Sequence, residues 1–311
     1  MARYLVTGGA GFIGSNICEE LVALGDDVRV LDDLSTGKRE NLAHLGARVE
    51  LVVGDVRDVG MLRDVVSGCD FVLHQAAVAS VPRSVAEPLL TDEVNVHGTL
   101  NVLMAARDAG VKRVVVASSC AVYGDDPELP KRETLRAWPT SPYAVSKLAT
   151  EQYARVASDL LGIEAVALRY FNVFGPRQDP AGDYAAVVPK FLERMLNGKP
   201  PIIFGDGGQT RDFVYVHDVV RANLAACVAP GGAGAVCNVA SGRRVNVRDL
   251  ARMVATAVGS DLEAVHEPAR AGDILHSVAD ISYTAERLGW RPAMDLTEGL
   301  RRTAAAMRTR S

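Results

Sequence analysis

The sequence predicts an α/β protein with a doubly wound parallel sheet, and three observations support this prediction. Apolar runs of strand length alternate with helix-length segments over about the first 170 residues of the 311-residue chain. Those runs are apolar throughout, as in strands that are buried on both faces. Apolar residues make up 48% of the chain and aromatic residues only 5%, a mixture that suits helices packed closely on a sheet.

The expected elements follow one another in β-α-β order. Strands are expected at 3–7, 27–31, 49–53, 71–75, 114–118 and 165–169, and helices at 12–24, 58–67, 89–109 and 143–161. Beyond about residue 175, five prolines between 176 and 201 break up the chain. This change predicts a smaller C-terminal lobe, with the segments 213–216 and 235–239 as strands that return to the main sheet.

Composition excludes several classes of protein. The formal net charge is −4 and the pI is about 5.9, so we expect no nucleic-acid partner and no anionic membrane partner. Five cysteines without a C-x-x-C pair, and scattered histidines, argue against disulfides and a metal site. No apolar run is long enough for a membrane span, and the chain enters a strand without a secretion signal. We therefore expect a soluble cytoplasmic protein.

A glycine-rich turn joins the first expected strand to the first expected helix. Gly8, Gly11 and Gly14 have the spacing that permits a tight turn, close approach of a pyrophosphate, and close helix–strand packing. Asp32 ends the second strand 18 residues past Gly14, where a carboxylate can bind ribose hydroxyls and repel a 2′-phosphate. NAD is therefore favoured over NADP, with Asp33 as the neighbouring candidate. The alternative is that Asp32 only starts a turn.

Asp55 and Val56 follow the third expected strand. They are candidates for contact with the adenine. The alternative, that Asp55 caps the next helix, is equally compatible with the sequence.

A tyrosine–lysine pair indicates acid–base chemistry. Tyr143 and Lys147 are four residues apart and share one face of an expected helix. An ammonium beside a phenol lowers the pKa of the tyrosine and makes it a usable base. Ser119 lies at the carboxyl end of the strand 114–118, where ligands bind in such sheets. A surface pair and ordinary turn serines are the alternatives.

Together these motifs resemble the extended short-chain dehydrogenase/reductases, and specifically the NAD-dependent nucleotide-sugar epimerase/dehydratase family. Within it, the chain is similar to the UDP-glucose and UDP-N-acetylglucosamine 4-epimerases. The resemblance covers essentially the whole chain and rests on 7–14, Asp32, 74–77, 95–99, 118–124, 142–147, 169–172, 205–212 and 270–273. It implies an NAD-binding Rossmann domain over 1–170, with return segments near 213–241, and a mainly nucleotide-sugar-binding lobe over 171–311.

The resemblance also implies roles for individual residues. Tyr143 is the expected base and acid, Lys147 tunes it, and Ser119 supports the reacting hydroxyl. The expected NAD contacts are Gly8, Gly11, Phe12, Ile13, Gly14, Asp32, Asp33, Asp55, Val56, Ala76, Ala77, Asn95, Ser118, Tyr143, Lys147 and Tyr170. The expected substrate contacts are Ser80, Arg83, Ser119, Cys120, Tyr143, Asn172, Val188, Phe204, Arg211, Arg270, Asp273 and Ser277.

Among the substrate contacts, Asn172 would hold the diphosphate, with Arg211 and Arg270 as charge-assisted donors. Phe204 would stack on the uracil, and Asp273 would bind its ribose. Surface ion pairs are the alternative for the two arginines. Core packing is the alternative for Phe204.

The residues after Ser119 favour one reaction. Dehydratases of the family carry an Asp-Glu pair there and decarboxylases a nearby Glu, whereas this chain has Cys120 and Ala121. A 4-epimerase that inverts C4 through a transient 4-keto sugar is therefore expected. The alternatives are a nucleotide-sugar dehydratase or reductase of the same family, or a non-catalytic NAD-binding regulator. Cys120 is interpreted as a small buried apolar residue.

The identity of the UDP-sugar stays open between the glucose, N-acetylhexosamine and glucuronate forms. Ser277 stands where hexose-restricted relatives have a large aromatic, which implies room for a 2-acetamido group. Arg83 or Arg177 could supply a cation for a uronate, although Asn172 and Asp179 depart from the uronate pattern. A homodimer is expected through the helices near 89–109 and 143–161.

Overall fold

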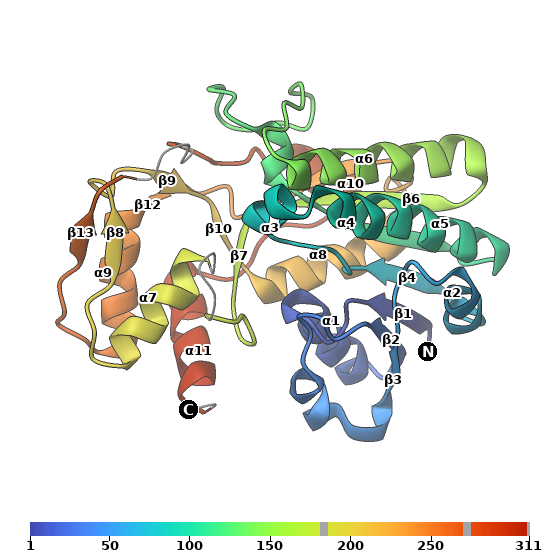
Figure 1. Cartoon of the computed structure of the whole chain (residues 1–311), viewed down its shortest axis with the longest axis horizontal. Coiled ribbons are helices and arrows are strands. Elements are labelled where there is room, and N and C mark those ends of the chain that lie inside the picture. The colour runs from blue at the N-terminus through green and yellow to red at the C-terminus, as the bar shows by residue number, and fades with distance from the viewer. Residues whose placement is uncertain (181–185, 270–274, 310–311) are drawn as a thin grey trace.

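The computed structural model describes residues 1–180, 186–269 and 275–309. Its centre is a seven-stranded sheet in the order β11-β6-β5-β4-β1-β2-β3, and each neighbouring pair is parallel (Figure 1). The predicted doubly wound α/β fold is therefore confirmed. The strands of this sheet are β1 (Arg3–Thr7), β2 (Asp27–Asp32), β3 (Val49–Val53), β4 (Phe71–His74), β5 (Arg113–Ser119), β6 (Glu164–Tyr170) and β11 (Val236–Val239).

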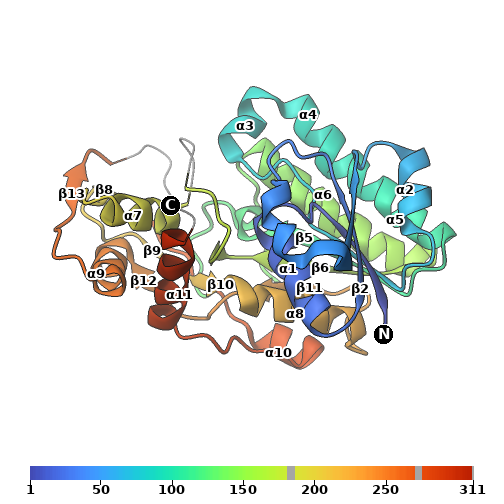
Figure 2. The ribbon, with the colours of Figure 1, turned by 90° about the horizontal axis from the view of Figure 1, so that it is seen from below.

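Helices cover both faces of this sheet because successive strand residues point to opposite sides. Val115 packs in a core with residues of α1 and α8, whereas Val114 and Val116 pack with residues of α2 and α5. Figure 2 shows the two helical layers on either side of the strands. These helices are α1 (Phe12–Ala23), α2 (Val59–Val66), α5 (Gly98–Asp108), α6 (Pro142–Val156) and α8 (Val216–Val228).

The long helix expected at 89–109 is present as a continuous helical run from Pro88 to Asp108, with a π-helical turn inside it. The structure has α3 (Val81–Ala86) and α4 (Pro88–Asp92), then a π-helical turn over Glu93–His97 that leads into α5. A second π-helical turn, Ala157–Leu161, extends α6 up to Gly162. The remaining short helical turns are 3₁₀ and comprise Arg39–Asn41, Ala43–Arg48 and Cys120–Tyr123.

A smaller lobe has its own core, built from α7, α9, α11 and short strands. One prediction for this region is wrong, because β10 pairs with β7 and not with the main sheet. The edge of β6 is already occupied by β11, and Phe213 and Tyr215 of β10 are buried in the core of the smaller lobe. The elements concerned are β7 (Asn172–Phe174), α7 (Val187–Leu196), β8 (Ile202–Phe204), β9 (Thr210–Arg211), β10 (Phe213–Tyr215), β12 (Val245–Asn246), α9 (Val247–Val258), β13 (Val265–Glu267) and α11 (Leu296–Arg308).

The chain crosses between the two lobes more than once. After residue 170, α8, β11 and α10 (Ser282–Leu288) pack with the main sheet, while α9 and α11 pack in the smaller lobe (Figure 2). Because elements on both sides of residue 170 belong to the main sheet, the domain boundary expected there stays a prediction. Throughout the described part of the chain, every helix is too short or too polar to cross a bilayer.

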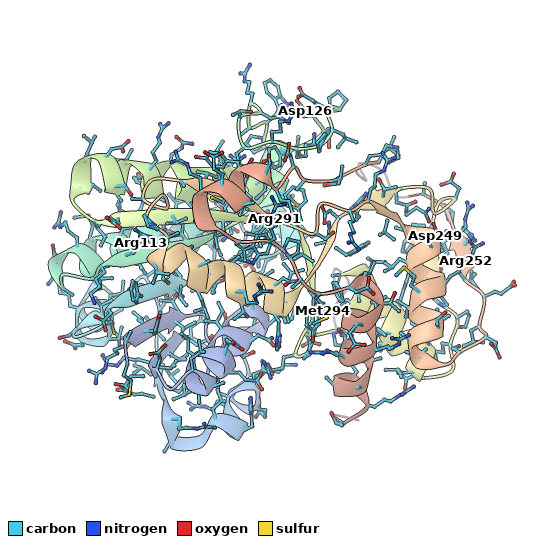
Figure 3. The ribbon with its side chains drawn as sticks, turned by 180° about the vertical axis from the view of Figure 1, so that it is seen from behind. Arg113, Asp126, Asp249, Arg252, Arg291 and Met294 are labelled. Carbon is cyan, nitrogen blue, oxygen red and sulfur yellow. The ribbon has the colours of Figure 1, made fainter. Side chains whose placement is uncertain are left out.

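The buried aspartate Asp218 holds the segment that precedes α11, where the chain passes from the main sheet to the smaller lobe. Asp218 of α8 is 3% exposed and accepts hydrogen bonds from the backbone N–H groups of Ala293 at 2.9 Å and Met294 at 3.0 Å. Figure 3 shows Met294 on the segment that leads to α11. Asp218 thus ties the smaller lobe to a helix of the main sheet.

We expect Asp218→Ala to lower the free energy of unfolding by about 2 kcal/mol or more, because two backbone donors lose their acceptor. Asp64→Ala is the control, since Asp64 is an exposed aspartate of α2, and it should cost about 0.5 kcal/mol or less. Denaturant titration measures both. Equal losses would contradict the tethering role of Asp218.

Candidate active site

The glycine-rich turn brings three backbone segments into contact. Gly8 has φ of +67°, and a Cβ there would lie 2.7 Å from the backbone nitrogen of Ala76. A Cβ on Gly14 would lie 2.2 Å from the carbonyl oxygen of Gly8. Side chains at either position would separate β1 from α1 or from the end of β4. The turn therefore forms a backbone cradle at a helix N-terminus, which fits the pyrophosphate of NAD.

Asp32 ends β2 beside this cradle and is only 6% exposed. Its carboxylate accepts hydrogen bonds from the N–H groups of Ala10 and Leu34, both at 2.9 Å. Burial raises the pKa of Asp32 in spite of these two donors. Asp32 therefore both organises the turn that follows β2 and presents an acceptor beside the cradle, so the two interpretations of this residue are compatible.

One cavity of about 1240 Å³ collects most of the expected NAD contacts. Its lining includes Gly8, Gly11, Phe12, Ile13, Gly14, Asp32, Asp33, Asp55, Val56, Ala76, Ala77, Ser118, Tyr143, Lys147 and Tyr170, together with Ser80 and Arg83. These residues come from the carboxyl ends of β1, β2, β3, β4, β5 and β6 and from α1, α3 and α6. Segments far apart in the sequence thus form one site.

Several expected contacts lie elsewhere. Among the described residues, those that do not line the cavity are Asn95, Ser119, Cys120, Asn172, Val188, Phe204, Arg211 and Ser277. Val188 is buried in the core of the smaller lobe, and the amide nitrogen of Asn172 donates to the carbonyl of Asp212 at 3.0 Å. Arg270 and Asp273 lie outside the described residues.

The structure excludes the capping alternative for Asp55. Asp58 caps α2 by accepting a hydrogen bond from the N–H of Met61 at 3.0 Å. Asp55 instead pairs with Arg57 at 2.7 Å, and this guanidinium lowers the pKa of Asp55. Asp55 remains ionised at the rim of the cavity.

The N-terminal turn of α6 presents Tyr143. Ser141 caps the helix by accepting a hydrogen bond from the N–H of Ala144 at 3.2 Å, and Pro142 occupies the first turn, where its missing N–H costs nothing. The N–H of Tyr143 donates to the hydroxyl of Ser84 at 3.0 Å. The Tyr143 phenol forms a hydrogen bond with the side chain of Ser119, so these two residues meet although Ser119 does not line the cavity.

Lys147 lies one helical turn behind Tyr143. Its ammonium is 5.9 Å from the centre of the Tyr143 ring and donates to the carbonyl of Ala117 at 2.8 Å. Burial lowers the pKa of Lys147 to about 8 and raises that of Tyr143 to about 12. The expected lowering of the tyrosine pKa is therefore not seen, because desolvation of the phenolate outweighs an ammonium that is directed at a carbonyl.

A hydrogen-bonded network of polar side chains lies under the cavity, and the sequence analysis did not predict it. His74 contacts the hydroxyl of Thr7 at 2.7 Å through Nδ1 and that of Thr99 at 3.0 Å through Nε2. Thr99 donates to the carbonyl of Asn95, and Asn95 bonds to Ser146 and to the backbone of Val78. Burial lowers the pKa of His74 to about 3, so the ring is neutral. Asn95 thus acts behind the cavity wall.

A second polar group missed by the sequence analysis surrounds Tyr170. The Tyr170 hydroxyl contacts Gln75 at 3.1 Å and Asn223 at 3.0 Å. Asn223 comes from α8, so only the folded chain places it here. A glutamine at the carboxyl end of a buried strand was the available signal for Gln75.

Two further residues of the sequence analysis can be placed. Cys120 is half-buried, and burial raises its pKa to about 11, so it is a protonated thiol beside Ser119 and not fully buried. Arg177 is directed at α1, where it donates to Ser15 and Asn16 and pairs with Glu19. Arg177 also lines the cavity, so the expectation that it supplies a cation for a uronate stays a prediction. Within the described ranges, no cluster of His, Cys, Asp and Glu has the arrangement of a metal site.

This arrangement of cradle, acidic strand end and Ser-Tyr-Lys group agrees with comparison to known proteins. Residues 4–240 match the model of the NAD dependent epimerase/dehydratase family. The chain belongs to this family. NAD dependence is a defining property of its members, and the cradle at Gly8 and Gly14 has the shape that this cofactor requires.

Individual relatives of the family match along nearly the whole chain. A UDP-glucose 4-epimerase of Mycolicibacterium smegmatis is 42% identical over 315 residues, with 99% of each chain covered. The structure of a UDP-N-acetylglucosamine 4-epimerase from Methanobrevibacter ruminantium, in complex with UDP-N-acetylmuramic acid, superposes with a TM-score of 0.95 at 39% identity, covering 100% of this chain and 99% of the other. A UDP-glucose 4-epimerase of Thermotoga maritima with UDP-glucose has a TM-score of 0.93 at 40% identity, covering 99% of both chains.

We expect Gly14→Ala to weaken NAD binding about tenfold or more, since forcing an extra methyl into a packed site costs about 1–3 kcal/mol. NAD titration of the stripped protein measures this loss. Gly60→Ala is the control, because Gly60 is exposed in the first turn of α2 and a Cβ there meets only a side-chain oxygen of Asp58 at 3.3 Å. Unchanged NAD affinity in Gly14→Ala would contradict the close-packing role.

Proposed function

We propose that this protein is an NAD-dependent UDP-sugar 4-epimerase. The observation that carries the proposal is the placement of Tyr143 and Lys147 in the wall of the cavity that Gly8, Gly14 and Asp32 also line. A cofactor held by the cradle and a sugar beside Tyr143 would share this one cavity. Similarity to 4-epimerases along the whole chain supports the same reaction.

Three side chains of the site move and position the proton. Burial raises the pKa of the Tyr143 phenol to about 12, so Tyr143 would act as a base only with the positive charges of Lys147 and of bound NAD beside it. In that state it would accept the proton of the C4 hydroxyl and later return it. Ser119, its hydrogen-bond partner, would orient the same hydroxyl. Lys147, with a pKa of about 8, is mostly protonated at neutral pH. Its ammonium, 5.9 Å from the ring centre, would favour the phenolate as Tyr143 loses its proton. When bound, NAD supplies reversible hydride acceptance at C4, so no net oxidation results.

The site argues against the alternatives. Elimination of water needs a further acid and base, but Cys120 is a protonated thiol and Ala121 carries no ionisable group, so dehydration is disfavoured. A regulator without activity would not need a Ser-Tyr-Lys group oriented in this way. The uronate form of the substrate stays open, because Arg83 and Arg177 both line the cavity while each also pairs with a partly exposed glutamate.

We further propose a homodimer that forms through α3, α4 and α6. These neighbouring helices expose Val85 (63%), Leu89 (79%) and Val145 (53%), apolar side chains that a second copy would cover. The cytoplasm is the proposed compartment, in keeping with five cysteines that are all free thiols.

The proposed reaction is tested by incubating the protein separately with UDP-glucose, UDP-N-acetylglucosamine and UDP-glucuronate. Proton NMR of the sugar should show inversion at C4 for at least one of the three, with UDP-glucose as the first expectation. The substrates that react define the sugar that the pocket accepts. A 4-keto-6-deoxy product would support the dehydratase alternative, and no reaction of any sugar would refute the epimerase.

We expect Tyr143→Phe to lower the rate of C4 inversion by about 10²–10⁴-fold, because the general base is lost, while NAD stays bound. Tyr153→Phe is the matched control, since Tyr153 lies on the same helix outside the cavity lining, and it should react at nearly the wild-type rate. Rates come from the NMR assay, and NAD content from the absorbance of the released cofactor. Full activity in Tyr143→Phe would refute the assigned base.

A further inference from the structure

A buried ion pair lies directly behind the tyrosine–lysine pair. Glu151 follows Lys147 by one turn of α6 and has no exposed surface, and Arg169 of β6 is 5% exposed. The Arg169 guanidinium donates two hydrogen bonds of 2.8 Å, one to each carboxylate oxygen of Glu151. Ser118 of β5 donates a third, at 2.6 Å. The carboxylate is thus held by two strands of the sheet.

Packing alone does not explain this pair. Burying two charges costs free energy that their attraction often fails to recover, and an apolar pair of the same volume commonly serves stability as well. A second pair, Arg113–Glu164, joins the opposite ends of the same two strands, and Figure 3 shows Arg113 on that part of the sheet. Its Glu164 side chain is 52% exposed. Of these two ion pairs, only Glu151–Arg169, the pair next to Lys147, has both partners buried.

We propose that Glu151, held in place by Arg169 and Ser118, is a positioning residue that keeps the ammonium of Lys147 protonated behind Tyr143, where the carbonyl of Ala117 holds it. This inference rests on the proposed epimerase function. Glu151 itself would touch neither the sugar nor the cofactor, because Lys147 stands between it and Tyr143 along α6.

The electrostatics of the helix support this role. Residues four apart on a helix have Cβ atoms about 5–6 Å apart, and an opposite charge at such a distance favours the charged form of a lysine. Burial lowers the pKa of Lys147 to about 8, and the Glu151 charge acts in the opposite direction. Without Glu151, the unpaired Arg169 would disfavour the ammonium further.

Other groups near Lys147 do not supply this negative charge. His74 of β4 is neutral, since burial lowers its pKa to about 3. Burial keeps the Tyr143 phenol and the Cys120 thiol protonated at neutral pH, with pKa values of about 12 and 11. Charged groups on α3, α4, α5 and the π-helical turn are substantially exposed and make their own ion pairs, namely Arg83, Glu87, Asp92, Glu93, His97, Arg107 and Asp108.

The test is the pH profile of kcat/KM for Glu151→Gln in the NAD-loaded protein. The alkaline limb reports loss of the Lys147 proton, and we expect it to move down by about one pH unit or more. Glu151→Asp keeps the charge and should retain a limb close to that of the wild type. Glu164→Gln, which breaks the matched pair at the other end of β5 and β6, should not move the limb. An unmoved limb in Glu151→Gln, or an equal movement in Glu164→Gln, overturns the proposal.

A second measurement needs no substrate. Between the lowered pKa of Lys147, about 8, and its ordinary value of 10.5, the unfolded chain binds more protons at this residue than the folded chain. Lys147 by itself therefore makes the free energy of unfolding rise with pH in this window, whereas the buried thiols, whose pKa values are raised, make it fall. The difference in the free energy of unfolding between Glu151→Gln and the wild type removes the shared contribution of the thiols. This difference should begin to change at a pH below 8, and a difference that does not vary with pH overturns the proposal. If wild-type protein interconverts no UDP-sugar, the proposed function fails, and this measurement still decides the coupling of Glu151 to Lys147.

A paired variant covers the case in which Glu151→Gln does not fold. Glu151→Met combined with Arg169→Met removes both charges and leaves neither partner buried alone. We expect this variant to fold, to bind NAD and to show the same downward movement of the alkaline limb. A folded double variant with the wild-type limb overturns the proposal.

Discussion

The close approach of backbone to backbone at Gly8 and Gly14 is the constraint on which the rest of the site depends. With no Cβ at these positions, the end of β1, the first turn of α1 and the end of β4 come together at distances that a side chain would forbid. This contact sets the direction of α1 and leaves its N-terminal N–H groups open to the cavity. Asp32 then completes one side of the cradle by accepting the N–H of Ala10.

Burial is the second physical theme of the site. Lys147, Tyr143, His74 and Glu151 lie where charge is costly, and the same desolvation lowers the pKa of the first, raises that of the second and keeps the third neutral. Chemistry near neutral pH then depends on how positive charge is arranged around the phenol. The buried carboxylate of Glu151 belongs to that arrangement and does not merely join two strands.

Much of the fold could be predicted from the sequence, because continuous apolar strands and amphipathic helices have clear local patterns. The strand limits were right to within about two residues, and the order β-α-β fixed the parallel sheet. The placement of β10 was wrong, because pairing depends on which sheet edge is free and not on the apolar character of Phe213 to Tyr215. The π-helical turn between α4 and α5 was also missed, since such a turn leaves no simple repeat in the sequence.

The sequence by itself determined the glycine cradle, the acidic end of β2 and the tyrosine–lysine spacing, because each is local and depends on backbone freedom or helical periodicity. Only the tertiary structure decided what surrounds these groups. It turned Arg177 toward α1, buried Val188 in the smaller lobe, and brought Asn223 to Tyr170 and Arg169 to Glu151. These contacts join residues distant in the chain, and their energies depend on burial, which no local pattern specifies.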